Sequence, residues 1–173
     1  TSDGIWQTGV INTKTHTLTP IASKYTSMHG VCSHGGNVCM VAGAAAIPEE
    51  IISITPPSSP TVVYSPASLP IDTEELSEPE SIFFPSAEGK IVHAFYYPPA
   101  NTLHGADNSD LPPAIAICHG GPTGATDSGL NLKIQYWTNR GFAVVDINYR
   151  GSTGFGRTYR QELVNAWGLA DVE

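Results

Sequence analysis

Two short glycine-containing stretches of this sequence could do chemistry, and each directly follows an apolar run. The first is His119-Gly120-Gly121, within IAICHGGPTG. Two adjacent glycines at the end of a strand expose backbone N–H groups that no side chain shields, and two or three such donors stabilise a developing negative oxygen. Pro122 has no N–H and fixes its own φ, which stiffens the loop after the donors. The alternative interpretation is a strand-ending glycine turn that binds nothing.

The second stretch is NYRGSTGFGR, residues 148–157. Its glycines and small hydroxyl residues allow the chain to fold close to neighbouring backbone. Arg150 or Arg157 could hold a substrate carbonyl, since a guanidinium presents several N–H donors. The alternative is an arginine that braces the loop by pairing with one of three acidic residues, Asp127, Asp146 or Asp171. A phosphate-binding loop is excluded because G-x-G-x-x-G does not occur and no lysine follows.

The elements that must position these stretches follow a strand, helix, strand order. Residues 114–118 (AIAIC) and 142–148 (FAVVDIN) are continuous apolar runs, which predict strands buried on both faces. Between them, Leu130, Ile134 and Trp137 are spaced as on one face of a helix, and Gly141 is placed to end it. This order predicts a parallel pair in an α/β sheet, so both loops should lie at the same edge of the sheet.

Further strands are predicted at 81–84 (SIFF) and 91–97 (IVHAFYY), before the parallel pair. A last helix is predicted from about Thr158 onward. Its buried side should carry four residues, Leu163, Ala166, Trp167 and Ala170.

The first third of the chain predicts an antiparallel sheet of short strands. The same tripeptide, His-Gly-Gly, occurs here at residues 34–36, where we interpret it as a hairpin turn whose glycines supply positive φ. The proline-rich and acidic segment between Ile54 and Pro79 predicts a linker. The strands are expected at residues 4–11, 25–31, 37–46 and 50–54.

Composition limits the partners of this chain. Its 173 residues include 16 acidic and 8 basic side chains, for a net charge of −8, which repels phosphate backbones and anionic lipid. We therefore expect no nucleic acid and no membrane as partner, and no apolar run of membrane-spanning length or secretory leader pattern is present. The three cysteines fit neither a metal motif nor a disulfide framework, which predicts reduced thiols and a cytoplasmic location.

Taken together in their order and spacing, IAICHGGPTG, QYWTNRGFAVVDINYRGSTGFGRTYR and AWGLADVE resemble the start of the catalytic domain of the prolyl oligopeptidase family. The likeness covers 82–173 and is to the acylaminoacyl-peptidase and dipeptidyl-peptidase branch. It implies an α/β hydrolase fold, of which only the N-terminal part of the sheet is present, preceded by antiparallel strands from the end of a β-propeller. The implied divisions are 1–66 for the last propeller blade, 67–80 for a linker and 81–173 for the hydrolase part.

The resemblance also implies site residues and a substrate. It gives Gly121 the oxyanion-hole N–H, with His119 and Gly120 shaping the loop, and it places NYRGSTGFG beside the mouth of the active site, where Arg150 is a candidate for substrate binding. A short peptide is the implied substrate, with no cofactor and no metal. A homo-oligomer is left open.

The sequence contains no candidate nucleophile. No serine lies in G-x-S-x-G; Ser33 and Ser152 come nearest, but valine and arginine stand where the first glycine is needed. In α/β hydrolases the serine, acid and histidine follow in that order after this loop, which makes His93, His104 and His119 poor candidates for the general base. The chain begins without methionine and ends in an expected helix, so we expect a piece of a longer protein that is inactive alone.

Two rival interpretations remain open at this point. One is a carboxylesterase or lipase, against which an upstream propeller would count. The other is a non-catalytic interaction module whose hydrolase-like part has lost its chemistry. A G-x-S-x-G motif in sequence beyond Glu173, followed by an acid and a histidine, would favour an enzyme, and its absence would favour the module.

Overall fold

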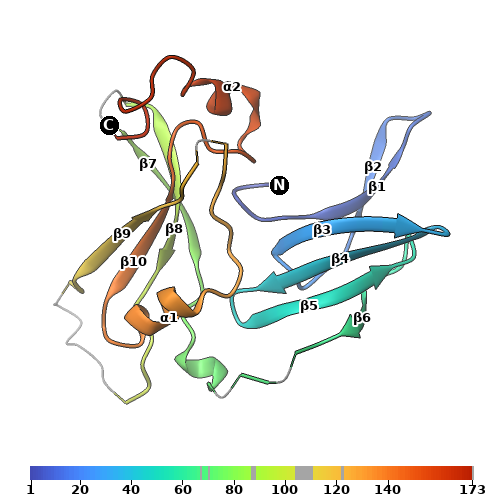
Figure 1. The fold of residues 1–173 in the computed structure, drawn as a ribbon, viewed down its shortest axis with the longest axis horizontal. Coiled ribbons are helices and arrows are strands. Elements are labelled where there is room, and N and C mark those ends of the chain that lie inside the picture. The colour runs from blue at the N-terminus through green and yellow to red at the C-terminus, as the bar shows by residue number, and fades with distance from the viewer. Residues whose placement is uncertain (67, 70, 87–88, 104–110, 122, 173) are drawn as a thin grey trace.

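A computed structural model describes residues 1–66, 68–69, 71–86, 89–103, 111–121 and 123–172 (Figure 1). Among these residues the strands form three sheets. The first is a ribbon of β1 (Thr8–Asn12) and β2 (Thr17–Ile21). The second has the order β3 (Ser27–His34), β4 (Asn37–Ala44), β5 (Ile47–Ile54), β6 (Thr61–Tyr64). The third has the order β7 (Glu80–Pro85), β8 (Ile91–Tyr97), β10 (Ala143–Asn148), β9 (Ala114–Cys118).

The β3–β6 sheet is antiparallel throughout, as the sequence predicted for this part of the chain. The hairpin at the first His-Gly-Gly is confirmed, because Gly35 and Gly36 form the turn with φ of 58° and 84°. Two differences emerge. The strand β2 was not predicted, and β6 lies inside the proline-rich segment that was interpreted as linker. The prolines fall outside the four residues of β6, so they leave its backbone free to pair with β5.

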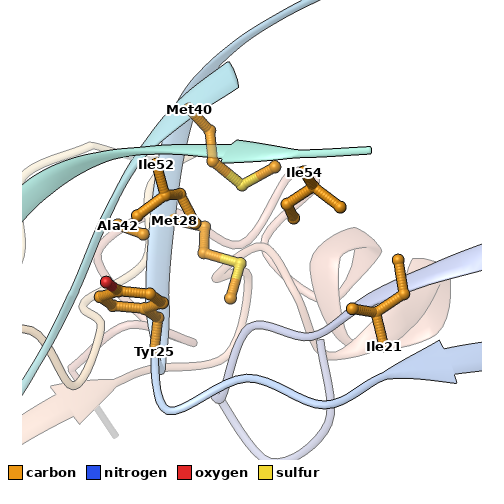
Figure 2. Packing of buried hydrophobic residues seen from close by; sticks show 7 residues of the cluster. All are labelled: Ile21, Tyr25, Met28, Met40, Ala42, Ile52 and Ile54. Carbon is orange, nitrogen blue, oxygen red and sulfur yellow. The ribbon is translucent and has the colours of Figure 1, made fainter. Parts of the chain in front are cut away.

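An apolar core lies on one face of the β3–β6 sheet (Figure 2). Met28, Met40 and Ile52 come from neighbouring strands, and Ile52 is completely buried. Ile21, at the end of β2, brings the ribbon onto the same core. Alternate residues of each strand therefore point inward, which is why a short ribbon and a sheet can share one core.

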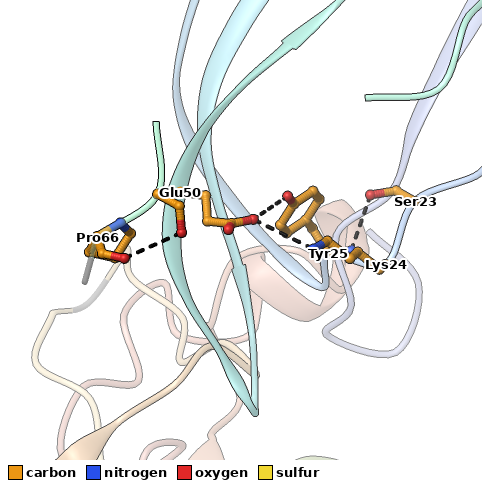
Figure 3. A network of polar contacts seen from close by, with 6 residues as sticks. Ser23, Lys24, Tyr25, Glu50 and Pro66 are labelled. Carbon is orange, nitrogen blue, oxygen red and sulfur yellow. Dashed lines mark hydrogen bonds and ion pairs between the residues drawn. The ribbon is translucent and has the colours of Figure 1, made fainter. Parts of the chain in front are cut away.

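A polar contact closes one end of this core (Figure 3). The buried Tyr25 hydroxyl donates to Glu50 of β5, and Lys24 Nζ lies 3.6 Å from the same carboxylate. Burial raises the pKa of Tyr25 well above its ordinary value, and the hydrogen bond from Tyr25 lowers the pKa of Glu50. The backbone N–H of Tyr25 also donates to Ser23 Oγ, at 3.1 Å. Segment 23–25 is thereby fixed to β5.

The β7–β10 sheet contains the predicted parallel pair. β10 pairs parallel with β9 and antiparallel with β8. The expectation that both strands of the pair are buried is correct for β10 and wrong for β9, whose residues alternate between exposed and half-buried. The reason is position, because β9 is an edge strand of this sheet whereas β10 lies between two strands.

Helix α1 (Leu132–Thr138) follows β9 at the predicted place. Asn131 caps its start by accepting from the Lys133 N–H at 3.0 Å, and Gly141 with φ of 84° follows its end. The predicted apolar face is only partly correct. Ile134 packs into a core with three residues of the sheet, but Trp137 is 38% exposed. The sheet residues of this core are Phe95, Tyr97 and Val144.

The C-terminal helix is shorter than predicted. Helix α2 (Gly156–Gln161) is followed by turns as far as residue 172. Leu163 is buried as expected, whereas Trp167 is 60% exposed. Asn165 and Gly168 have φ of 60° and 75°, and residues in this left-handed conformation interrupt an α-helix.

The first residues of the chain lie between the two larger sheets (Figure 1). Thr1 Oγ1 donates to the Gly154 carbonyl at 2.7 Å, and Ser81 Oγ of β7 donates to the Asp3 carbonyl at 3.2 Å. Gly4 is buried against the ring of Phe95. The N-terminal segment therefore ties the β1–β6 part to the β7–β10 sheet.

The acidic segment after β6 also packs on the side of the molecule that holds the β7–β10 sheet. It includes a short 3₁₀ helix, η1 (Thr73–Glu75), and the buried residue Ser77. The Ser77 N–H donates to Gln135 Oε1 of α1 at 2.8 Å, and Gln135 Nε2 donates back to the Ser77 carbonyl at 2.9 Å. Within the described residues, no helix is long and apolar enough to cross a membrane.

We expect Gly4→Ala to destabilise the protein more than Gly35→Ala. Both glycines have positive φ, which costs a residue with a Cβ about 1–2 kcal/mol. A Cβ at Gly4 would lie 2.6 Å from Phe95 Cζ, whereas one at Gly35 would meet nothing within 4 Å. Crowding should therefore add about 1–3 kcal/mol for Gly4→Ala. Urea unfolding of both variants measures the difference, and equal losses would show that the N-terminal segment is not docked as described.

Candidate active-site loops

The candidate site is built where β9 and β10 end. The register pairs Cys118 with Ile147, so the chain leaves both strands level with each other and at the same edge of the sheet. The loop that follows β9 begins at His119, and the loop that follows β10 begins at Tyr149. The prediction that the two glycine-containing stretches meet is confirmed. Pro122 lies outside the described residues.

His119 is the residue that joins the two loops. Its ring stacks on Tyr149, with centroids 4.4 Å apart and planes inclined by 18°. Its Nε2 lies 2.7 Å from Ser152 Oγ, and the Tyr149 hydroxyl donates to its carbonyl at 3.4 Å. A fourth contact links the loops further along, since the Thr153 N–H donates to the Gly124 carbonyl at 2.9 Å. The loop after β9 is therefore held by the loop after β10.

The hydrogen bonds of His119 determine which nitrogen carries the proton in its neutral form. Nδ1 lies 2.9 Å from the Gly120 carbonyl, which can only accept. Nδ1 is therefore the protonated nitrogen, and Nε2 accepts from the hydroxyl of Ser152. Both nitrogens are therefore occupied by contacts within the two loops.

Gly120 and Gly121 present their backbone without a side chain. Both are exposed, and within the described part of the chain no hydrogen bond uses either N–H. A Cβ at Gly121 would lie 3.1 Å from the Tyr149 hydroxyl and 3.3 Å from the Thr123 nitrogen. A Cβ at Gly120 would meet nothing within 4 Å. The close approach of Tyr149 thus favours glycine at position 121, and both amides are available to an acceptor from outside the loop.

Polar residues of β10 hold the next part of the loop. Asn148, fully buried, accepts from the Thr126 N–H at 2.8 Å and donates to the Thr126 carbonyl at 3.2 Å. The Thr126 hydroxyl donates to Asp146. Burial raises the pKa of Asp146, against the lowering effect of Thr126 and His119. Thr126 is therefore attached to β10 through its backbone and its side chain.

A cavity of about 530 Å³ opens beside His119. Its walls come from both parts of the molecule, since Ser27 and Glu49 belong to the β3–β6 sheet whereas Asp127 and Lys133 follow β9. Ser27 Oγ donates to Asp127 Oδ2 across this boundary at 3.0 Å. The described residues contain no group of three His, Cys, Asp or Glu side chains that could hold a metal ion.

Both the sequence and the structure of this chain are similar to those of known proteins. Residues 128–173 match the model of the prolyl oligopeptidase family. The chain is 32% identical over 98 residues to dipeptidyl-peptidase 4 of Giardia intestinalis, covering 54% of this chain and 12% of that protein. Its structure superposes on a puromycin-hydrolyzing peptidase of Mycobacterium tuberculosis with a TM-score of 0.90 and 33% identity, covering 99% of this chain and 27% of the other. The chain is thus similar to these peptidases and, over residues 128–173, to the prolyl oligopeptidase family.

A plant enzyme is also similar to this chain. The acylamino-acid-releasing enzyme of Arabidopsis thaliana is 34% identical over 67 residues, which cover 39% of this chain and 9% of that enzyme. The chain therefore spans only a small part of the length of the relatives it matches, and about a quarter of the mycobacterial peptidase.

Arg150 was a candidate for substrate binding, and the structure places it elsewhere. Its side chain is buried, with 3% of the residue exposed, and Nη1 lies 3.8 Å from Glu162 Oε2. Lys90 Nζ lies 3.5 Å from the same oxygen. Among the described residues, the acid that pairs with Arg150 is Glu162, which was not one of the three aspartates considered from the sequence. Contact between Arg150 and a substrate stays a prediction, which this buried position does not favour.

Sequence reasoning missed Ser152 and Tyr149 as partners of His119. The sequence predicted that the stretch containing them is a loop, but it suggested roles only for the arginines of that loop. The signal that could have found them is the parallel pairing itself, which sets the first residues after each strand side by side. Although Ser152 lies beside a histidine, it is completely buried and cannot reach a substrate.

We expect Ser152 to be a structural residue. In Ser152→Ala, His119 loses its hydroxyl partner, so unfolding free energy should fall by about 1–2 kcal/mol. Ser33→Ala is the matched control at an exposed serine, and it should change stability by less than about 0.5 kcal/mol. Unfolding in urea measures both. Labelling of Ser152 in the folded chain by a fluorophosphonate probe would instead make it a reactive nucleophile, contrary to this interpretation.

His93 lies on β8, opposite Asn148 of the neighbouring strand β10. It is 1% exposed, its Nδ1 accepts from Asn148 Nδ2 at 3.1 Å, and its Nε2 donates to Ser81 Oγ at 2.9 Å. The Ser81 proton goes to the Asp3 carbonyl, so the neutral ring has both nitrogens satisfied. Burial lowers the pKa of His93 below its ordinary value of 6.5.

We expect this histidine to make stability depend on pH. Because the pKa of His93 is lower in the folded chain, the unfolded chain binds more protons below about pH 6.5, and unfolding free energy should fall as pH decreases. The limiting slope is about 1.4 kcal/mol per pH unit. His93→Gln should remove this contribution, whereas the exposed His34→Gln should keep it. Urea titrations at several pH values measure the slopes, and parallel profiles for wild type and His93→Gln would refute the assignment.

Proposed function

We propose that this chain is part of a serine-type peptidase of the prolyl oligopeptidase family that cleaves short peptides through an acyl-enzyme. In this proposal residues 1–66 are the end of a β-propeller, 67–80 are a linker, and 81–173 are the N-terminal part of an α/β-hydrolase domain. The antiparallel β3–β6 sheet and the parallel pairing of β9 with β10 support this division.

The observation that carries the proposal is the loop of His119, Gly120 and Gly121. It follows a strand at the carboxyl edge of the sheet, its glycine amides are unused within the described residues, and its shape is held by Tyr149 and Ser152. Fixed donors facing an open position are what a developing oxyanion requires, because they need no rearrangement during the reaction. We assign the oxyanion-binding N–H to Gly121.

The cavity beside His119 supports a peptide substrate. One wall belongs to the β3–β6 sheet and the other to the segment after β9, and both carry polar groups, such as the hydroxyl of Ser27 and the carboxylate of Asp127. A peptide lying in this space could satisfy its own backbone polar groups while its carbonyl approaches the glycine loop. The Giardia and mycobacterial relatives are peptidases by name, which agrees with this substrate class.

The catalytic triad must come from residues other than these. No serine of the printed sequence lies in G-x-S-x-G, and in an α/β hydrolase the serine, acid and histidine follow the oxyanion loop in the chain. We therefore propose that this chain supplies one half of the oxyanion hole to a longer polypeptide. Alone, it should not hydrolyse peptides, because donors without a nucleophile give only part of the machinery.

The test is to replace the Gly121 amide by an ester in the complete enzyme through semisynthesis. This change removes the N–H and leaves the chain's shape almost unchanged. Loss of one oxyanion donor should lower kcat about 10²–10³-fold, equivalent to about 3–4 kcal/mol, with a smaller effect on KM. Kinetic assays with a peptide substrate and with an ester substrate measure kcat. The same two assays distinguish a peptidase from a simple esterase.

The matched control is the same ester replacement at Gly36, in the hairpin that carries the other His-Gly-Gly. It should leave kcat unchanged, because that turn joins β3 and β4, which lie in a different sheet from β9. Full kcat in the Gly121 ester, with unchanged melting, would contradict the oxyanion assignment. Absence of hydrolysis in the unmodified complete protein would favour a non-catalytic interaction module.

A further inference from the structure

Two of the three cysteines lie opposite each other in the β3–β4 hairpin. The register pairs His34 with Asn37 next to the turn, Ser33 with Val38, and Cys32 with Cys39. Directly opposite residues of an antiparallel pair project to the same face of the sheet, so the two thiols are neighbours. Both cysteines are free in this structure.

The thiol pair lies on the face away from the apolar core. Met40 points into that core and Val38 packs against it, which places Cys39, between them in the strand, on the opposite face. Cys32 is exposed and Cys39 is half-buried. Beyond Cys39, the next strand presents Ser53. A small reagent can therefore reach the pair without opening the fold.

The spacing permits a disulfide but does not favour an unstrained one. Pairs along a hairpin alternate between hydrogen-bonded and non-hydrogen-bonded positions, and counting from the His34 and Asn37 pair makes Cys32 and Cys39 a hydrogen-bonded pair. Cα atoms at such positions are about 5.5 Å apart, within the range of disulfides. Cβ atoms stand about 4.5–5.5 Å apart, whereas a disulfide prefers about 3.8 Å. The strands must approach each other to form the bond.

We propose that Cys32 and Cys39 form a redox-active dithiol, which closes to a readily reduced cross-strand disulfide by exchange with a low-molecular-weight disulfide. One thiolate attacks a sulfur of the small disulfide, forming a mixed disulfide and releasing one small thiol. The second cysteine then attacks the protein sulfur and releases the other small thiol. The two cysteines are oxidised, the small disulfide is reduced to two thiols, and the cysteine protons pass to solvent and the leaving thiolates.

Strain makes this disulfide reversible. Disulfides with unfavourable geometry or exposure are more easily reduced than relaxed structural ones. The pair is thus suited to cycle between thiol and disulfide.

Cys118 provides an internal comparison. It lies on β9 in the other four-stranded sheet, and burial raises the pKa of its thiol, with Asp146 and Asp171 adding to the effect. Its thiolate is therefore scarcer at neutral pH, and no cysteine is paired with it across β10, where its register partner is Ile147. It should not form an intramolecular disulfide.

The test treats the folded 173-residue chain with oxidised glutathione, then alkylates free thiols and maps the peptides by mass spectrometry. We expect a Cys32–Cys39 link, loss of alkylation at both residues, and continued alkylation at Cys118. Reduced glutathione should restore both thiols. In Cys32→Ser, the matched variant, Cys39 should keep a bound glutathione, because no second thiol displaces it; Cys118→Ser should behave as the wild type.

Circular dichroism before alkylation establishes that the treated chain remains folded. Separate glutathione adducts on Cys32 and Cys39 of the wild type, without a link, would overturn the proposal. So would a link that forms only in urea, or one that reduced glutathione cannot open. This experiment does not involve hydrolysis, so its outcome is independent of the proposed peptidase function.

Discussion

The parallel pairing of β9 with β10 is the constraint on which the candidate site depends. Because Cys118 lies opposite Ile147, the loops after β9 and β10 leave the sheet side by side. His119 therefore lies where it can stack on Tyr149. A shift in this register would move the imidazole away from Ser152 and separate the loops. The glycine amides therefore owe their fixed position to backbone hydrogen bonds in the sheet, and side-chain contacts from the loop after β10 complete it.

The same pairing shows how far sequence could predict the fold. The two apolar runs look alike, so strand type and parallel order followed from local pattern and from the helix between them. The burial of β9 could not be predicted in this way, because the exposure of its two faces depends on segments that are distant in sequence. Within the described residues, β9 has a partner strand on one side only. The predicted length of the last helix was wrong for a local reason. Asn165 adopts a left-handed conformation that its apolar surroundings did not signal.

For the candidate site, sequence located the loops but not the directions of their side chains. Arg150 turns inward because Glu162 lies there, and nothing near Arg150 in sequence identifies that acid as its partner. The two His-Gly-Gly tripeptides make a similar point. Gly35 and Gly36 need glycine for positive φ, whereas Gly121 is crowded by the hydroxyl of Tyr149 and lies outside the left-handed region. Identical residues are thus required for different physical reasons, which only their surroundings distinguish.

The hairpin of the first His-Gly-Gly differs in what its sequence determines. A two-residue turn fixes the register of both its strands, so counting outward from Gly35 and Gly36 pairs Cys32 with Cys39 without any knowledge of the remaining fold. A parallel pair has no such reference, because a long connection separates its strands and leaves several registers open. The cysteine pair was therefore within reach of sequence analysis once the turn was recognised, whereas the contact of His119 with Ser152 required the folded sheet.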